Sequence, residues 1–421
     1  MEQLLKLLSD GKTQFHVVEA CKSILSDNGF EELAYEDSRE LVPGGKYMLS
    51  PFRSMLFAWT MGAKNSPLRI ACAHTDFPML KIKSNPEITK KGYVQVNVEP
   101  YGGLLSKTWF DRPLGMAGKV VLSGDNPFAP KVKLFDSQKP LFMIPNLAPH
   151  LERDKTKEFD VQKELIPILS CTSSLDASEI TNGHVTEGFL LRYLAGNLDV
   201  SVESILDYDL YLYISGAPEQ VGLKDEFLAA ARIDNTSSVS AILEAITQNS
   251  NQNITAVAAL FDNEEIGSRS KQGADSMLLR ELLERICPGR QLGANSFNLS
   301  VDVAHATHPN YIEKNDITND IILGNGVVLK SSASQRYVTD SEAGAVIAAL
   351  CRQNDIPFQR QVNRSGMPGG QTLGPIMSSY LPIRSADIGI PILAMHSACE
   401  LAHKTDYESL VKLLTAYYHE A

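Results

Sequence analysis

Hydrophobic residues in the first part of the chain follow two kinds of spacing. Between residues 17 and 25 they recur at helical intervals and stop before Gly29, which predicts a helix with a glycine at its end. The segment 67–78 is almost continuously apolar in its first half, as is typical of a strand buried on both faces. Shorter strands are predicted at 46–49 and 55–59.

The pattern changes between residues 84 and 222. Val94, Val96 and Val98 alternate with polar residues, which predicts a strand with one buried face. Further short strands separated by Gly, Pro and Asn are predicted at 118–124, 131–135 and 209–215. We therefore expect residues 84–222 to form a β-rich unit inserted into another domain.

Strands and helices alternate after residue 225. Apolar runs predict strands at 254–261, 296–303, 326–330 and 391–397. Amphipathic segments predict helices at 235–248, 274–286, 340–354 and 406–419. This alternation indicates a layered α/β sheet. The simplest architecture is one discontinuous α/β domain, residues 1–83 and 223–421, with the β-rich unit inserted.

Composition and charge exclude several classes of protein. The 421 residues include 39 basic and 50 acidic side chains, giving a net charge of −11, and the only dense basic element is the pair Lys90 and Lys91. Nucleic acid is therefore not an expected partner. No apolar run is long enough for a membrane span, and the N-terminus lacks the features of a signal peptide. The six cysteines are scattered without a CxxC motif, so we expect a reducing, cytoplasmic location.

Histidines and acids gather where the predicted strands end or helices begin. Ligands collect at the carboxyl ends of strands in open α/β sheets, and a half-buried charge there is costly unless it is paired or metal-bound. A single such group is usually a solvated loop acid, but five groups in one chain favour a site. The five segments are His74–Asp76, Arg232–Asn235, Asp262–Glu265, Asp302–His305 and Met395–Ser397.

These residue types suit a hydrolytic site with two divalent metal ions. Imidazole and carboxylate ligands hold Zn, Mn or Co without thiolates, and one bridging carboxylate lets about five ligands hold two ions. The candidate ligands are His74, Asp234, Glu265, Asp302 and His396. Glu264, beside Glu265, is a candidate general base, and Asp76 could orient the His74 imidazole.

Ordered motifs along nearly the whole chain resemble the aspartyl aminopeptidases, a family of cytosolic two-metal exopeptidases. The motifs include "AHTDFP", "YGGLLSKTWFDRPLG", "IPNLAPHL", "ARIDNTSS", "FDNEEIGS", "SVDVAHATHPNY", "GVVLKSSASQRYVTD" and "DIGIPILAMHSACE". The resemblance implies a three-layer α/β metallopeptidase domain whose inserted β-rich domain builds a homo-oligomer, a dodecamer. It also implies hydrolysis of an N-terminal residue, preferentially Asp or Glu, from short peptides.

The resemblance assigns a role to each candidate residue. It implies that His74 and Asp302 are terminal ligands of one ion, Glu265 and His396 of the other, and that Asp234 bridges them. Glu264 matches the general base and Asp76 the residue that supports the histidine. The resemblance adds substrate contacts at His305, Lys330, Tyr337 and His150, the last of these reaching a neighbouring subunit. From sequence alone, Lys330 could instead pair with a nearby Asp or Glu of the protein.

The sequence departs from the family pattern at Phe77, Lys107, Pro113 and Gln371. None of these is a predicted metal ligand, so they bear on substrate preference, and a preference for neutral N-terminal residues stays open. A noncatalytic assembly or cargo protein on the same fold is a further alternative. A retaining glycosidase would also use two carboxylates, but the histidines would then have no role.

Overall fold

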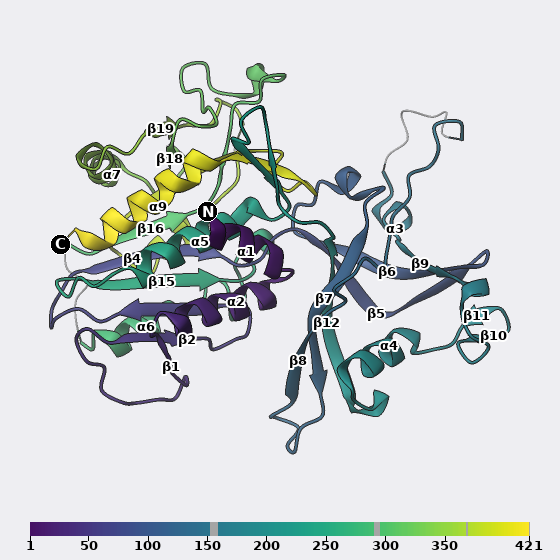
Figure 1. The fold of residues 1–421 in the computed structure, drawn as a ribbon. Helices are drawn as coiled ribbons and strands as arrows, with labels where there is room; N and C mark the ends of the chain where they lie inside the picture. The colour runs from purple at the N-terminus through teal and green to yellow at the C-terminus, as the bar shows by residue number, and fades with distance from the viewer. Residues whose placement is uncertain (152–158, 290–294, 368, 421) are drawn as a thin grey trace. The chain divides into compact units, whose positions relative to one another are not determined.

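The computed structural model describes residues 1–151, 159–289, 295–367 and 369–420 (Figure 1). The chain forms two compact units, one from Met1–Phe77 with Ala217–Ala421 and the other from Pro78–Gly216. The junctions therefore fall a few residues before those expected at 84 and 222. The first falls earlier because a long strand, β5 (Met79–Lys90), starts two residues after Phe77 and crosses the expected boundary.

The main sheet of the first unit has the order β1-β2-β3-β15-β4-β16-β20-β18-β19. Its central strands β15, β4, β16 and β20 are parallel neighbours, and β15 is buried along its whole length. The strands are β1 (Glu31–Glu32), β2 (Lys46–Leu49), β3 (Leu56–Thr60), β15 (Thr255–Phe261), β4 (Leu68–His74), β16 (Phe297–Val301), β20 (Arg384–Gly389), β18 (Val327–Lys330) and β19 (Phe358–Gln361).

Helices cover both faces of this sheet (Figure 1). On one face lie α1 (Glu2–Asp10), α2 (Gln14–Asp27), α5 (Ile233–Thr247) and α9 (Lys404–His419). On the other lie α6 (Leu278–Ile286) and α8 (Leu373–Ser378), whose apolar side chains belong to the same core cluster as Phe57 and Trp59 of β3. Helix α7 (Ser341–Gln353) packs against β20 and α9. This layered arrangement confirms the predicted α/β class.

A smaller sheet in the same unit has the order β13-β14-β22-β21-β17. Its strands are β13 (Glu219–Val221), β14 (Phe227–Ala230), β22 (Glu400–His403), β21 (Pro391–Leu393) and β17 (Ala304–His305). The strand expected at 391–397 ends at Leu393 because Ala394 and His396 adopt left-handed backbone conformations, with φ of 57° and 65°. Helix α1 was not predicted, although Leu4, Leu7 and Leu8 form its buried stripe.

The second unit is built on a sheet with the order β8-β7-β12-β5-β6-β9. Val94, Val96 and Val98 are all buried, as their alternation predicts. Besides β5, the sheet contains β6 (Tyr93–Tyr101), β7 (Leu114–Leu122), β8 (Lys131–Asp136), β9 (Ile168–Cys171) and β12 (Ile205–Ile214). The unit also contains β10 (Ile180–Thr181), β11 (His184–Val185), α3 (Val161–Glu164) and α4 (Phe189–Leu198).

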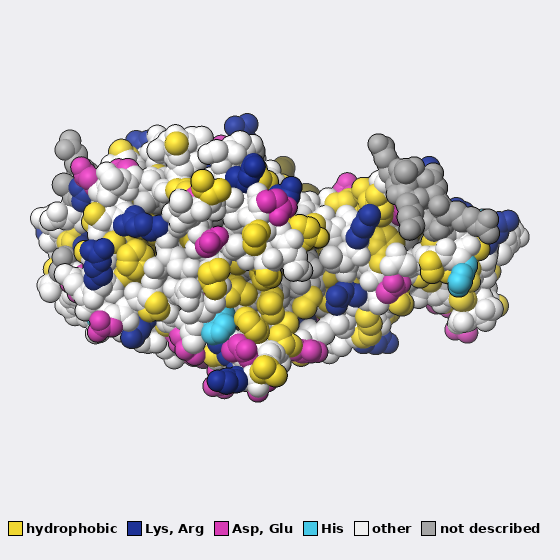
Figure 2. Space-filling model, turned by 90° about the horizontal axis from the view of Figure 1, so that it is seen from above, with side chains coloured by type: hydrophobic (Ala, Val, Ile, Leu, Met, Phe, Trp, Pro, Cys, Tyr) yellow, Lys and Arg dark blue, Asp and Glu magenta, His cyan; other side chains and the backbone are white. Residues whose placement is uncertain are grey.

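Basic and acidic side chains are interspersed over the face shown in Figure 2. Of the helices that the structure describes, none combines the length and apolar character needed to cross a bilayer. The six cysteines all lie in the described part of the chain, and none of them forms a disulfide.

Candidate metal centre

The ends of three neighbouring parallel strands bring most of the predicted site residues together. His74 is the last residue of β4, Asp302 follows β16, and Glu264 and Glu265 lie in the short 3₁₀ helix η4 (Glu264–Ile266) after β15. Because β15, β4 and β16 are adjacent and parallel, their carboxyl ends meet at one edge. Gly389 at the end of β20 lets the main chain of Asp302 pass close to β20, since a Cβ at position 389 would lie 1.7 Å from the Asp302 carbonyl oxygen.

The two remaining candidate ligands come from irregular backbone. Asp234 lies at the start of α5 with non-helical dihedral angles, and Arg232 before it has a φ of 67°. His396 lies in the loop between β21 and β22 with a φ of 65°. Left-handed conformations are disfavoured for residues with a Cβ and tend to cluster at functional sites.

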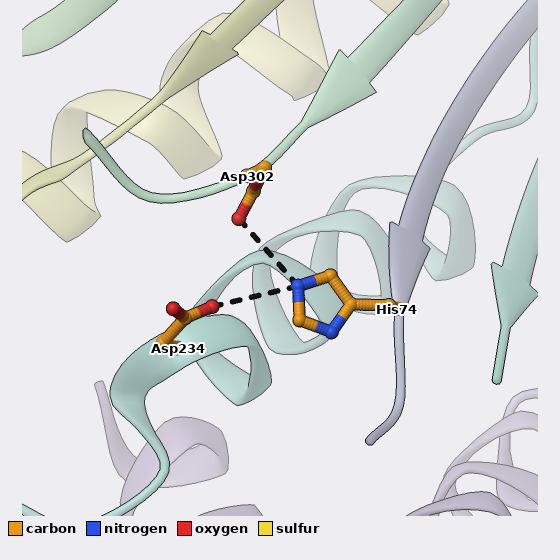
Figure 3. A group of neighbouring side chains, drawn as sticks. All are labelled: His74, Asp234 and Asp302. Atoms are coloured by element: carbon orange, nitrogen blue, oxygen red, sulfur yellow. Dashed lines mark ion pairs between the residues drawn. The ribbon is translucent and has the colours of Figure 1, made fainter. Parts of the chain in front are cut away.

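The carboxylate of Asp234 lies between two histidines. Its Oδ1 is 3.4 Å from His74 Nε2, and its Oδ2 is 3.3 Å from His396 Nε2. Asp302 Oδ1 lies 3.6 Å from the same His74 nitrogen, so both carboxylates point at one ring atom (Figure 3). On the other side, Glu265 Oε2 lies 3.4 Å from His396 Nε2. Asp234 therefore belongs to two candidate metal-binding groups, one with His74 and Asp302 and the other with Glu265 and His396.

Asp76 fixes the geometry of the first histidine and of the two glutamates. His74 Nδ1 lies 3.0 Å from the Asp76 main-chain oxygen, which can only accept a hydrogen bond. In a neutral imidazole Nδ1 therefore carries the proton, and the lone pair of Nε2 points at Asp234 and Asp302. The buried Asp76 carboxylate accepts the backbone N–H groups of Glu264 and Glu265 at 3.1 and 3.2 Å.

Glu400 plays the corresponding part around His396, and it was not among the predicted site residues. Its side chain is buried; one oxygen accepts the backbone N–H of Asp234 at 3.1 Å and the other that of His396 at 2.7 Å. The signal in the sequence was an acid at the start of a short apolar strand, four positions after His396. Its partner Asp234 is 166 positions away, so the contact was not predictable.

Two carboxylate oxygens in the site have no hydrogen-bond donor among the described residues. These are Asp234 Oδ1 and Glu265 Oε1, both buried. A buried carboxylate oxygen without a donor is costly unless a cation compensates it. The surrounding donors are imidazole and carboxylate, a set that suits Zn, Mn or Co. The residues therefore fit divalent metal ions.

Protonation equilibria in the site are strongly perturbed in opposite directions. Burial raises the pKa of Glu264 to about 8, against the lowering effect of His74. Burial likewise raises the pKa of Glu265 well above its usual value. Burial acts against the charged form of His74, but Asp234, Asp302 and Asp76 outweigh it and raise its pKa. For Asp234, His396 and His74 outweigh burial and lower the pKa. Such opposed shifts are typical of functional sites.

These groups line a cavity of about 200 Å³ together with the predicted substrate contacts His305, Lys330 and Tyr337. Lys330 is buried, and its Nζ donates to the carbonyl oxygens of Asp302 and Val303, each at 3.0 Å. It lies 3.7 Å from Asp302 Oδ2 and 5.2 Å from the centre of the Tyr337 ring. Burial would lower the pKa of Lys330, but Asp302, Tyr337 and Asp387 raise it, so the side chain is an ammonium.

The remaining predicted positions are distributed between the two units. Of the four departures from the family pattern, Gln371 lines the cavity, whereas Phe77 is buried with its ring 5.6 Å from the Arg232 guanidinium. Lys107 and Pro113 are exposed in the second unit. His150 is also exposed in that unit, so its role remains a prediction.

Comparison with known proteins places these observations in a family. The family described as "Aminopeptidase I zinc metalloprotease (M18)" matches residues 7–418. A "Probable M18 family aminopeptidase 2" of Clostridium novyi is 40% identical, over 99% of this chain and 98% of that protein.

Solved structures agree with this match. One, described as "Cryo-EM structure of the Ape4 and Nbr1 complex", aligns with a TM-score of 0.93 at 30% identity, over 99% of this chain and 84% of that one. Another, described as "Structure of S. cerevesiae mApe1 dodecamer", aligns with a TM-score of 0.83 at 26% identity, over 99% and 95% of the two chains. The chain belongs to the M18 family of zinc metalloproteases and is a metal-dependent aminopeptidase.

Proposed function

We propose that this aminopeptidase holds two divalent metal ions, zinc in keeping with its family, and removes N-terminal residues, preferring Asp or Glu, from short peptides. The position of Asp234 carries the proposal, because its two oxygens face two different histidines. His74 and Asp302 would complete one metal site, and Glu265 and His396 the other. Asp234 would then be the bridging ligand.

When bound, the two ions would acidify a water molecule and polarise the scissile carbonyl. Glu264 is placed to move the proton, because its Oε2 reaches to within 4.0 Å of His74 Nε2 in the same cavity. It would take the proton from the water and return it to the leaving amine. Asp76 supports this step by holding the backbone of Glu264.

Lys330 supports the preference for acidic N-terminal residues. Its buried ammonium forms part of the cavity wall beside His305 and Tyr337. A charge-assisted hydrogen bond to a substrate carboxylate contributes about 1.5–3 kcal/mol, or about tenfold to a hundredfold in discrimination.

One observation favours the second candidate, the same chemistry with a neutral N-terminal preference. The Lys330 ammonium already donates to two carbonyl oxygens and lies near the Asp302 carboxylate. These contacts are the internal pairing that the sequence left open. In this case Lys330 would position Asp302 and leave substrate choice to the shape of the cavity.

Substrate profiles distinguish the two candidates. We would measure kcat/KM for Asp-, Glu-, Ala- and Leu-terminated peptides with wild type, Lys330→Met and the control Lys412→Met, which alters an exposed lysine of α9. Acidic specificity predicts that wild type favours Asp and Glu and that only Lys330→Met loses this preference. A wild-type preference for Leu would establish the neutral candidate, and equal losses on all four peptides in Lys330→Met would show that Lys330 does not set the preference.

We further propose that the chain assembles as a homododecamer through its second unit, with His150 reaching the active site of a neighbouring subunit. The similar S. cerevesiae mApe1 structure is described as a dodecamer, and His150 is exposed here. Sedimentation velocity should show the large assembly. His150→Ala should lower kcat/KM while the dodecamer stays intact. A fully active monomer would contradict both parts of the proposal.

We propose a cytoplasmic location because the cysteines form no disulfides among the described residues. None of the six, all of which the structure describes, forms a disulfide, and Cys21, Cys72 and Cys351 are buried as small hydrophobic side chains. Thiols of this kind are typical of reducing compartments. Cell fractionation with a cytoplasmic marker enzyme tests the location.

A further inference from the structure

A second cavity, of about 290 Å³, adjoins the candidate active site. His305 lines both cavities, and the neighbouring residues Gly369 and Gly370 line the second and the first respectively. The two cavities therefore share one lining residue and lie beside each other along a second segment of the chain. None of the predicted metal ligands lines the second cavity, so a ligand there would touch the catalytic cavity only at its edge.

The second cavity contains a polar group that calls for a ligand. Gln361, the last residue of β19, is 5% exposed, and its Oε1 has no hydrogen-bond donor among the described residues. A buried acceptor that has lost its water without gaining a donor is unfavourable. A main-chain N–H of a bound peptide would supply the missing donor.

The charge at this cavity favours an anionic group. Lys314 and Arg364 are exposed on its lining, and no described carboxylate forms an ion pair with either. Asp316 also lines it, but its Oδ1 already accepts from Thr318 and from Asn319, at 3.1 and 2.7 Å. The lining therefore carries two cations against one carboxylate, so positive charge predominates and favours a substrate carboxylate.

We propose that this cavity binds the part of a peptide substrate that follows the cleaved bond. Gln361 accepts a main-chain N–H of that segment, and Lys314 and Arg364 bind its terminal carboxylate. This inference rests on the proposed aminopeptidase chemistry and adds to it a preference for short peptides with a free C-terminus. His305, which borders both cavities, lies where the peptide passes from one to the other.

The test compares substrates that do and do not extend past the cleaved bond. For the best-cleaved N-terminal residue, kcat/KM is measured with a tetrapeptide, its C-terminal amide and the aminoacyl p-nitroanilide. The variants are the double substitution Lys314→Met with Arg364→Met, the near-isosteric Gln361→Met, and the control Lys412→Met. The double variant alters two exposed residues, so we expect it to fold normally. It therefore tests the proposal even if Gln361→Met is unstable.

We expect the double variant to lose about tenfold in kcat/KM on the tetrapeptide and nothing on the anilide. In wild type, kcat/KM should be about tenfold lower on the C-terminal amide than on the tetrapeptide. In the double variant, the two substrates should give the same kcat/KM. Gln361→Met should also lower kcat/KM on both peptides and leave kcat/KM on the anilide unchanged. Equal losses on anilide and peptide, or no loss on either, would overturn the subsite while leaving the aminopeptidase intact. If wild type hydrolyses none of the substrates, the proposed function fails and the subsite fails with it.

Discussion

The candidate metal centre consists of two halves that use the same device on different backbone. In the His74 half, made of His74, Asp302 and Asp76, the buried Asp76 accepts two backbone N–H groups. In the His396 half, made of His396, Glu265 and Glu400, the buried Glu400 does the same. The His74 half is built on the ends of parallel strands, whereas His396 lies in a loop with a left-handed backbone.

The difference shows what holds each half in place. The side chain of His74 is 1% exposed and that of His396 is 29% exposed. Strand β4 is paired on both sides: β15 pairs with His74 itself, and β16 pairs with β4 as far as Cys72. His396 lacks this support, so the hydrogen bond from its backbone N–H to Glu400 carries more of its positioning. We therefore expect the His396 half to be the more sensitive to loss of its supporting carboxylate.

The largest effect is expected at Glu264, which lies near both halves. Glu264→Gln should lower kcat by about 10²–10⁴-fold, because the general base is lost. Metal content should stay at the wild-type value, since Glu264 is not one of the proposed ligands. Steady-state kinetics with metal analysis of the same sample checks this. Near-normal turnover would show that another group is the base.

Next in size is the loss of single ligands. His74→Ala and His396→Ala should each reduce the bound metal from two equivalents to one, because each removes a ligand from a different group. Elemental analysis after dialysis, with circular dichroism as a control for folding, measures the outcome. Loss of both ions in both variants would mean that the two halves form one inseparable site.

A smaller effect separates the two supporting carboxylates. Asp76→Asn and Glu400→Gln each replace one acceptor oxygen by a donor, and loss of such support costs about 10–100-fold in metal affinity or activity. Glu400→Gln should lower the affinity for the ion of the His396 half more than Asp76→Asn lowers the affinity for the ion of the His74 half. Glu244→Gln is the matched control, because the Glu244 carboxylate in α5 accepts a hydrogen bond from the Tyr407 hydroxyl. Titration of the chelated proteins with Mn²⁺ gives the affinities. Equal effects of Asp76→Asn and Glu400→Gln would remove the proposed asymmetry.

A further prediction concerns the pH dependence of metal binding. In the chelated protein the pKa of Glu264 is raised to about 8, so Glu264 binds a proton near pH 6, and the pKa of Glu265 is raised well above its usual value. Metal binding favours the deprotonated carboxylate, so affinity should rise with pH by about tenfold per unit for each proton released. Calorimetry with Mn²⁺ in buffers of different ionisation enthalpy measures the protons. Affinity that does not change between about pH 6 and about pH 8 would refute this.

The same contrast explains what the sequence could predict. Hydrophobic runs locate β4, β15 and β16, and parallel pairing then brings His74, Glu265 and Asp302 to one edge. Asp234 and His396 were suggested by residue type and by resemblance, since no periodicity places a loop. Glu400 and Gln361 could not be found, because their roles depend on hydrogen bonds made, or left unmade, in the folded chain. The hydrogen bonds of Lys330 to two carbonyl oxygens could not be predicted from the hydrophobic pattern either, because they also depend on the folded chain.

The central claim is that Asp234 joins two metal sites, and counting metal against activity tests it most directly. Protein stripped with a chelator would be titrated with Zn²⁺ while bound metal and aminopeptidase activity are followed in the same samples. The structure predicts saturation at two equivalents per chain, and Asp234→Asn should weaken both, because one oxygen faces each histidine. Full activity of the stripped protein, or saturation at one equivalent with the Asp234→Asn variant unaffected, would contradict it.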